Sequence, residues 1–152
     1  MQVAHTNVLL IDGHREEREY WKQHLTISSL DYVVLESDTG AAGLDICQSQ
    51  SIDCVVTELN LPDMSGFELL VHLVTRLSKP DIAVIMLTHT TLPAMATFAL
   101  NIGAQAYLIK SRISGGYLDA VIRKAIAAVG PISKKPAWDP TGLRTGANEP
   151  AS

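Results

Sequence analysis

The sequence predicts an α/β fold in which five parallel strands form a doubly wound sheet. Five short apolar runs, rich in β-branched residues, alternate along the chain with longer segments of helical character. Such runs are typical of parallel strands that helices cover on both faces, and their regular alternation indicates repeated strand-helix units. The length of 152 residues and the apolar content of 47% fit one domain with an ordinary core.

Each element follows from its residue pattern. The expected strands are residues 8–11, 32–35, 54–56, 83–87 and 107–109. The expected helices are residues 15–26, 40–50, 65–77, 92–102 and 115–129. The last helix is the clearest, because its apolar residues recur at the three- and four-residue spacing of a single stripe. These residues are Leu118, Val121, Ile122, Ala125, Ile126 and Val129.

The composition changes after Gly130. Prolines and glycines then fall among small polar residues, at Pro131, Pro136, Pro140, Gly142, Gly146 and Pro150. Such a segment cannot bury enough apolar surface to offset the entropy lost on ordering. We therefore expect residues 1–130 to form the domain and residues 131–152 to be a flexible tail or linker. Trp138 is the aromatic residue of this tail, and it either docks on a folded surface or stays in solvent.

Charge and composition exclude several classes of function. A net charge of −4 with five histidines counted neutral gives no basic surface for nucleic acid or an anionic membrane. Cys47 and Cys54 lie seven residues apart, which favours two buried thiols over a disulfide or a metal cluster. Residues 1–6 show no leader pattern, and the uncharged stretch 88–109 is too polar to span a membrane. We expect a cytoplasmic protein.

Polar residues follow the predicted strands at the edge where chemistry occurs in this class of fold. In doubly wound sheets, ligands bind outside the carboxyl ends of the strands. The residues at those ends are Asp12, Ser37, Glu58, Thr88 and Lys110. Singly, each has an ordinary explanation as a loop carboxylate, a helix cap or a solvated lysine. Together, they predict a functional site at this edge.

The segment around Glu58 resembles a known motif. An apolar run ends at Glu58, Pro62 follows four residues later, and Gly66 opens a helix that begins Gly-Phe-Glu-Leu-Leu. This pattern resembles the phosphoacceptor segment of response-regulator receiver domains from two-component signalling. The resemblance covers roughly residues 6–130 and implies a flavodoxin-like (βα)5 fold with strand order 2-1-3-4-5. It also implies that Thr88 and Lys110 contact a phosphoryl group and that Tyr107 is the aromatic switch residue.

Three departures distinguish this chain from that pattern. Where the family has its phosphoacceptor aspartate, this chain has Glu58, and where the family has a second acid after the first strand, this chain has Gly13. After the lysine, the family usually has a proline that follows a cis peptide bond, whereas this chain has Ser111. One carboxylate fewer should weaken Mg²⁺ binding or abolish it, so we expect no cofactor. An attacking oxygen displaced by roughly one C–C bond should slow phosphoryl transfer about a hundredfold. A cis bond before serine is unfavourable by about 2.5–4 kcal/mol, so we expect a trans bond there.

The longer side chain of Glu58 suggests a different role. Its carboxylate can reach toward Lys110 and the hydroxyl of Thr88, where it would partly mimic a phosphoryl group. The mimicry is incomplete, because a phosphate carries about −1.5 to −2 charge and three acceptor oxygens. The alternative is an ion pair between Glu58 and Lys110 without a signalling consequence.

The uncharged helix expected at residues 92–102 indicates a contact surface. Receivers commonly signal through the face formed by the fourth helix, fifth strand and fifth helix. Met95, Phe98 and Leu92 cannot all point inward together with the other apolar residues of this helix, so one side is left for docking or dimerisation. We take Met95 and Phe98 as interface candidates. The alternative is an alanine-rich helix whose exposed side chains are merely small.

Three functions remain open on this reading. The favoured one is a phosphorylation-independent receiver that is not an enzyme and acts by protein-protein interaction with a histidine kinase, an output protein or a second copy. The second is a single-domain response regulator that a histidine kinase still phosphorylates. The third is a flavodoxin-like enzyme or nucleotide binder, which is disfavoured because no Gly-x-Gly-x-x-Gly or Gly-x-x-x-x-Gly-Lys-Ser/Thr motif occurs.

Overall fold

The computed structural model describes residues 5–75 and 81–129 and confirms the predicted α/β architecture. The strands are β1 (Thr6–Ile11), β2 (Tyr32–Ser37), β3 (Cys54–Thr57), β4 (Ala83–Thr88) and β5 (Ala106–Ile109). The helices are α1 (Arg15–Ser28), α2 (Gly40–Ser49), α3 (Gly66–Thr75), α4 (Pro93–Asn101) and α5 (Gly115–Val129), with a short 3₁₀ turn, η1 (Lys110–Arg112). Within the described residues, the predicted ranges agree with the observed ones to within one or two residues at their ends. Residues 76–77 of the helix predicted at 65–77 and the predicted tail, residues 131–152, lie outside the described residues.

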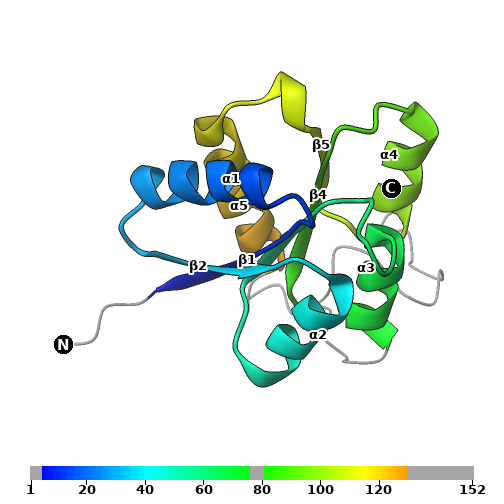
Figure 1. Cartoon of the computed structure of the whole chain (residues 1–152), viewed down its shortest axis with the longest axis horizontal. Helices are drawn as coiled ribbons and strands as arrows, with labels where there is room; N and C mark the ends of the chain where they lie inside the picture. The colour runs from blue at the N-terminus through cyan, green and yellow to red at the C-terminus, as the bar shows by residue number, and fades with distance from the viewer. Residues whose placement is uncertain (1–4, 76–80, 130–152) are drawn as a thin grey trace, which may run out of the picture.

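The five strands are parallel and lie in the order β2-β1-β3-β4-β5, as the resemblance implied. Helices α1 and α5 cover one face of the sheet, and α2 and α3 lie on the other (Figure 1). From β1, the chain first adds β2 on one side and then β3, β4 and β5 on the other side. The direction of winding therefore reverses between β1 and β3, and the carboxyl ends of these two strands flank the switch point of the sheet.

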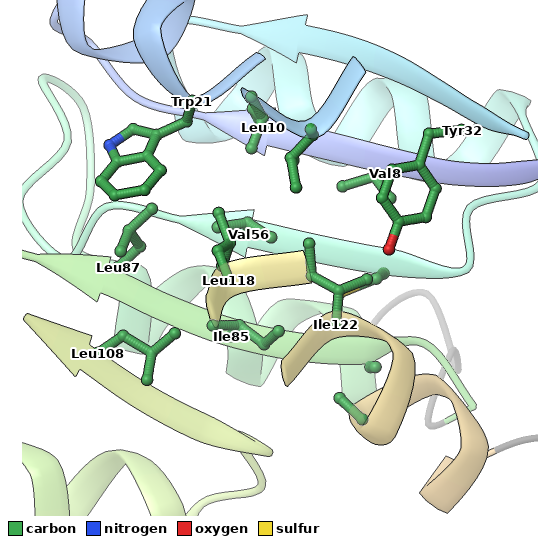
Figure 2. Close-up of a cluster of buried hydrophobic side chains, with 14 of the residues drawn as sticks. Val8, Leu10, Trp21, Tyr32, Val56, Ile85, Leu87, Leu108, Leu118 and Ile122 are labelled. Carbon is green, nitrogen blue, oxygen red and sulfur yellow. The ribbon is translucent and has the colours of Figure 1, made fainter. Parts of the chain in front are cut away.

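Alternation along the central strands divides the core into two layers. Val8 and Leu10 of β1 pack with the helices α1 and α5, whereas Leu9 and Ile11 pack with α2, α3 and α4. Successive side chains of a strand point to opposite faces, which is why an almost unbroken apolar run serves both layers. Figure 2 shows the first layer, in which Trp21 of α1 and Ile122 of α5 pack with strand residues such as Leu10.

The loop from β3 to α3 is held by a capping box at the start of α3 and by Asp63, whose carboxylate caps the start of α2. Ser65 and Glu68 form a capping box, in which the Glu68 amide donates to Ser65 Oγ at 3.1 Å and the Ser65 amide donates to the Glu68 carboxylate at 3.0 Å. The carboxylate of Asp63 accepts from the amides of Gly40 and Ala41 at the start of α2, at 2.8 and 2.9 Å. The loop after β3 is therefore anchored to the starts of both α2 and α3.

Two glycines are required by close or unusual backbone geometry. Gly103, with φ of 120°, turns the chain between α4 and β5 in a conformation that favours glycine. A Cβ on Gly66 would lie 2.9 Å from the carbonyl oxygen of Glu58, and the Gly66 amide donates to the Leu59 carbonyl at 2.7 Å. Gly66 therefore lets α3 begin directly against the end of β3.

Candidate functional site

The structure brings together four of the five polar residues at the carboxyl edge of the sheet. Asp12, Glu58, Thr88 and Lys110 are all buried and joined by direct contacts. Ser37, at the end of β2, does not join them, because its hydroxyl donates to the Thr39 carbonyl at 2.6 Å. The site is therefore centred on the ends of β1, β3, β4 and β5.

The ammonium group of Lys110 lies at the centre of this site. It contacts Asp12 Oδ2 at 2.6 Å, Glu17 Oε1 at 2.5 Å and Glu58 Oε1 at 2.9 Å, and its side chain is only 3% exposed. Lysine has three N–H donors, so each donor has one carboxylate. Burial alone would lower the pKa of Lys110, but the hydrogen bonds that its ammonium donates to the three carboxylates outweigh burial and raise the pKa. Lys110 is thus fixed as a cation.

Glu58 uses both carboxylate oxygens. Oε1 contacts Lys110, while Oε2 accepts from the amides of Leu59 at 2.7 Å and Asn60 at 3.1 Å, and from the hydroxyl of Thr88. Its side chain is 4% exposed. Burial would raise the pKa of Glu58, but the hydrogen bonds from Thr88 and Lys110 outweigh burial and keep the pKa below its ordinary value. The group is a buried, ionised carboxylate that accepts four contacts.

Glu17 belongs to the site although the sequence analysis did not single it out. Its Oε2 accepts from His89 Nε2 at 3.0 Å, on the side away from Lys110. Burial opposes the shift, but hydrogen bonds from Lys110 and His89 lower the pKa of Glu17 to about 2. A signal was present in the sequence: Glu17 precedes the buried Trp21 and Leu25 at four-residue intervals, so it lies on the inward face of α1.

A second set of hydrogen bonds links Thr88 to Tyr107. The Thr90 amide donates to Thr88 Oγ1 at 3.3 Å, and the Tyr107 hydroxyl donates to the Thr90 carbonyl at 2.8 Å. The side-chain amide of Asn60 donates to Thr90 Oγ1 at 3.2 Å. Thr90 therefore connects the loops after β3 and β4 with the aromatic residue of β5.

The expected trans bond after Lys110 is present, because the described residues contain no cis peptide bond. Lys110 begins the turn η1 directly after β5. A trans connection does not turn the ammonium away from the site, as the three carboxylate contacts show.

Comparison with known proteins identifies the family. The family model for the response regulator receiver domain matches residues 8–121. The chain belongs to the response-regulator receiver family. It is 29% identical over 136 residues to the response regulator protein FleR of Pseudomonas aeruginosa, covering 86% of this chain and 28% of FleR. It is 33% identical over 103 residues to the transcriptional regulatory protein UhpA of Escherichia coli, covering 68% of this chain and 50% of UhpA.

Solved receiver domains have the same fold. A CheY-like receiver domain protein from Methanospirillum hungatei has a TM-score of 0.74 at 25% identity, covering 83% of this chain and 97% of that one. A receiver domain protein from Clostridium thermocellum has a TM-score of 0.72 at 30% identity, covering 80% and 94%. The chain therefore spans nearly all of these domains but at most half of the two curated relatives named above.

Three side chains at the receiver site could offer ligand atoms to a metal ion. The ligand atoms of Asp12, His14 and Glu17 lie within 4.8 Å of one another. Gly13 offers no carboxylate, and Asp12 and Glu17 both contact the Lys110 ammonium. Any metal ion at this position would have to compete with that ammonium for both carboxylates.

Helix α4 carries no charged residue and leaves much of its apolar surface in solvent. Leu92, Phe98 and Leu100 are 58%, 49% and 48% exposed, and Met95 is half-buried. Ala99 is the buried residue of this helix, and Phe98 packs edge-on against Phe67 of α3 with ring centroids 4.8 Å apart. Of the two interface candidates, Phe98 is thus the more accessible.

Within residues 5–75 and 81–129, no helix combines the length and apolar character needed to cross a bilayer.

Proposed function

We propose that this protein is a phosphorylation-independent receiver in which Glu58 stands at the phosphoacceptor position and acts as a permanent substitute for the phosphoryl group. One observation carries the proposal: a single carboxylate contacts both the Thr88 hydroxyl and the Lys110 ammonium. The family resemblance assigns these two residues to the phosphoryl oxygens. Glu58 makes both contacts without phosphorylation.

The contacts beyond Thr88 support a link to a signalling surface. Thr88 is joined through Thr90 to the hydroxyl of Tyr107, which lies on β5 beside α4. A fixed Thr88 therefore favours one position of Tyr107. Because Glu58 carries one negative charge and a phosphate about −1.5 to −2, we expect a smaller bias of the switch than full phosphorylation would give.

The same contacts oppose the alternative, a response regulator that a histidine kinase still phosphorylates. Attack on a phosphodonor requires an accessible oxygen with a free lone pair, aligned with the leaving group. Glu58 is almost fully buried and both of its oxygens accept hydrogen bonds. The ammonium of Lys110 also occupies the space between the acids, so we propose that Mg²⁺ binds weakly or not at all.

We further propose that the protein is cytoplasmic, catalyses no reaction and acts through the face formed by α4, β5 and α5. The partner would be a signalling protein such as a histidine kinase or an output protein, or a second copy of the chain. The uncharged, half-exposed surface of α4 supports this choice of face.

Phosphate uptake by a set of variants tests the proposal. Four proteins are incubated with Mg²⁺ and a small phosphodonor: the wild type, Glu58→Asp, Gly13→Asp and the double mutant. The intact mass of each is then measured by mass spectrometry. A Cβ at position 13 would lie 3.0 Å from Pro62 Cγ, so the Pro62 ring must shift slightly to admit the new carboxylate. Metal and nucleophile act as one unit, so we expect the double mutant to gain more than the two single mutants together.

The outcomes are distinct. No adduct on the wild type, little on either single mutant and a clear adduct on the double mutant would support the proposal. Adding Asp12→Asn to the double mutant should remove the gain, because Asp12 would be a metal ligand. A phosphoryl adduct on the wild type would instead support the histidine-kinase alternative. Equal uptake by Glu58→Asp and the double mutant would show that Gly13 is not an obstacle.

A further inference from the structure

A pocket opens beside the Lys110 site, between α1 and the loop that follows β4. Its volume is about 340 Å³, within the range of small-ligand pockets. Its lining residues are Glu16, Glu17, Tyr20, Trp21, His89 and Lys110. Glu58 and Thr88 are not among its lining residues.

The pocket borders an excess of negative charge. Asp12, Glu17 and Glu58 place three carboxylates around the one ammonium of Lys110, which leaves two negative charges uncompensated within the cluster. The guanidinium of Arg18 does not compensate them, because it contacts the Asp12 backbone carbonyl and the carboxylate of Glu36.

Other groups facing the pocket change this balance little. His14 and His89 contact Asp12 and Glu17 and add positive charge only when protonated. Glu16 adds a further exposed carboxylate to the rim, with no hydrogen bond or ion pair to any other described residue. The pocket therefore favours a cationic ligand.

Trp21 provides an independent indication of a ligand. Its side chain is buried, with 4% exposure, and within the described part of the chain its indole N–H has no hydrogen-bond partner. Figure 2 shows the indole nitrogen pointing away from the other labelled side chains, toward the end of the sheet to which the arrowheads of β4 and β5 point. A buried donor without an acceptor is unfavourable, so an acceptor on a ligand in this pocket would stabilise the complex.

Tyr20 adds an aromatic surface to the same pocket. It is 47% exposed and packs edge-on against Trp21, with ring centroids 4.9 Å apart and an interplanar angle of 89°. A planar guanidinium stacks on such a ring and pairs with carboxylates through two parallel N–H groups, which an ammonium cannot do.

We propose that this pocket binds an arginine residue of a partner protein. The guanidinium lies on Tyr20 and pairs with the free carboxylate of Glu16, near Glu17, while a backbone carbonyl of the same peptide segment accepts from the Trp21 indole N–H. This site is separate from the α4 surface and does not depend on whether Glu58 accepts a phosphoryl group. The bound cation would compensate part of the excess negative charge around Lys110.

The indole N–H resonance of Trp21 provides the readout. The full chain labelled with ¹⁵N is titrated with the peptide acetyl-Ala-Arg-Ala-amide and, separately, with the same peptide containing citrulline, which has the shape of arginine without its charge. Trp21→Phe distinguishes the Trp21 resonance from that of Trp138. We expect a saturable shift with the arginine peptide and at least tenfold weaker binding of the citrulline peptide.

Two variants of α1 test where the peptide binds. Glu16→Gln removes the free carboxylate of the pocket and should weaken binding at least fivefold. Glu19→Gln removes the same charge from the same helix, but Glu19 pairs with Arg15 outside the pocket, so binding should be unchanged. Both residues are exposed, and amide dispersion verifies that each variant is folded. No saturable shift, equal binding of the two peptides, or equal effects of the two variants would overturn the proposal.

Discussion

The Lys110 site and the α4 surface are opposites in charge and exposure. At the site, the carboxylates of Asp12 and Glu58 and the ammonium of Lys110 are buried, Glu17 is partly exposed, and each hydrogen-bond donor of Lys110 has a partner. On α4, no residue is charged, and the large apolar side chains of Phe98, Leu100 and the N-cap residue Leu92 are about half exposed. The comparison shows that oppositely charged groups are concentrated around Lys110, whereas the exposed surface of α4 is uncharged and apolar. Thr90 and Tyr107 lie between the two regions.

The largest effect should come from removing the central cation. Lys110→Met leaves the buried carboxylates of Asp12 and Glu58 without a counter charge, and breaking a buried ion pair in this way typically destabilises a protein by about 3–5 kcal/mol. We expect a loss of that size in urea unfolding at pH 7. The control is Lys22→Met, because Lys22 pairs with Glu36 at 2.9 Å but is 43% exposed, and such pairs contribute about 0–1 kcal/mol. Equal losses in the two variants would contradict a buried cluster.

Acid should weaken the site before it affects α4. In the folded protein the pKa of Glu17 is about 2, against an ordinary value of 4.5, so the stability that Glu17 contributes is complete above about pH 4.5 and is lost as the pH falls toward 2. The lowered pKa of Glu58 acts in the same direction. Free energies of unfolding measured from pH 7 to pH 2 should therefore fall steeply below pH 4.5, and less steeply in Glu17→Gln.

The matched control for acid sensitivity is Glu19→Gln, which alters the surface pair with Arg15 on the same helix. It should retain the wild-type dependence on pH. If Glu17→Gln and Glu19→Gln give the same profile as the wild type, Glu17 does not contribute to the site in the way its contacts indicate.

A smaller effect is expected at the connection between the two regions. Tyr107→Phe removes one hydrogen bond, from the hydroxyl to the Thr90 carbonyl, which should reduce the unfolding free energy by about 1 kcal/mol. Amide shifts should change at Thr90 and along the start of α4. Tyr117→Phe is the control, because the Tyr117 side chain is 53% exposed and its hydroxyl has no hydrogen bond to the described residues. Comparable shifts in both variants would argue against the connection.

The smallest effect on stability should come from α4 itself. Replacing Met95 and Phe98 by glutamate disrupts a contact surface, together with the ring contact to Phe67, but only Ala99 of this helix is buried. We expect a folded monomer that has lost self-association, measured by sedimentation, or partner capture, whereas Ile27→Glu, at the far end of α1 with 82% exposure, behaves as the wild type does in both experiments. Loss of the thermal transition would show that the two side chains belong to the core.

The sequence predicted the fold far better than the connections within the site. Strand positions follow from apolar runs, and the residues at strand ends must share one edge of a parallel sheet, so the proximity of Asp12, Glu58, Thr88 and Lys110 follows from topology. Glu17 was missed because it lies on a helix rather than at a strand end. Its contact with Lys110 depends on how α1 packs against the sheet. The spacing of apolar residues indicates which face of α1 points inward, but not how close Glu17 comes to Lys110.

Two further features could not be predicted from the residue pattern. The hydrogen bonds from Thr88 through Thr90 to Tyr107 depend on the path of the loop after β4, and no local signal in the sequence sets that path. The degree of exposure on α4 depends on its contacts with α3 and β5. Met95 and Phe98 were both expected at the surface because they share an uncharged helix, but only Phe98 is about half exposed, whereas Met95 is more buried.

We propose that Glu58 alone holds the switch residues Thr88 and Tyr107 in place, and one set of amide spectra tests this proposal. Spectra of the wild type are recorded with and without Mg²⁺ and a phosphodonor, and compared with those of Glu58→Gln, which retains the shape of the side chain but not its charge. We expect no change in the amide resonances of Thr88, Thr90, Tyr107 or α4 on adding the phosphodonor, and clear shifts at these positions in Glu58→Gln. Shifts on adding the phosphodonor, together with an unchanged spectrum in Glu58→Gln, would contradict it.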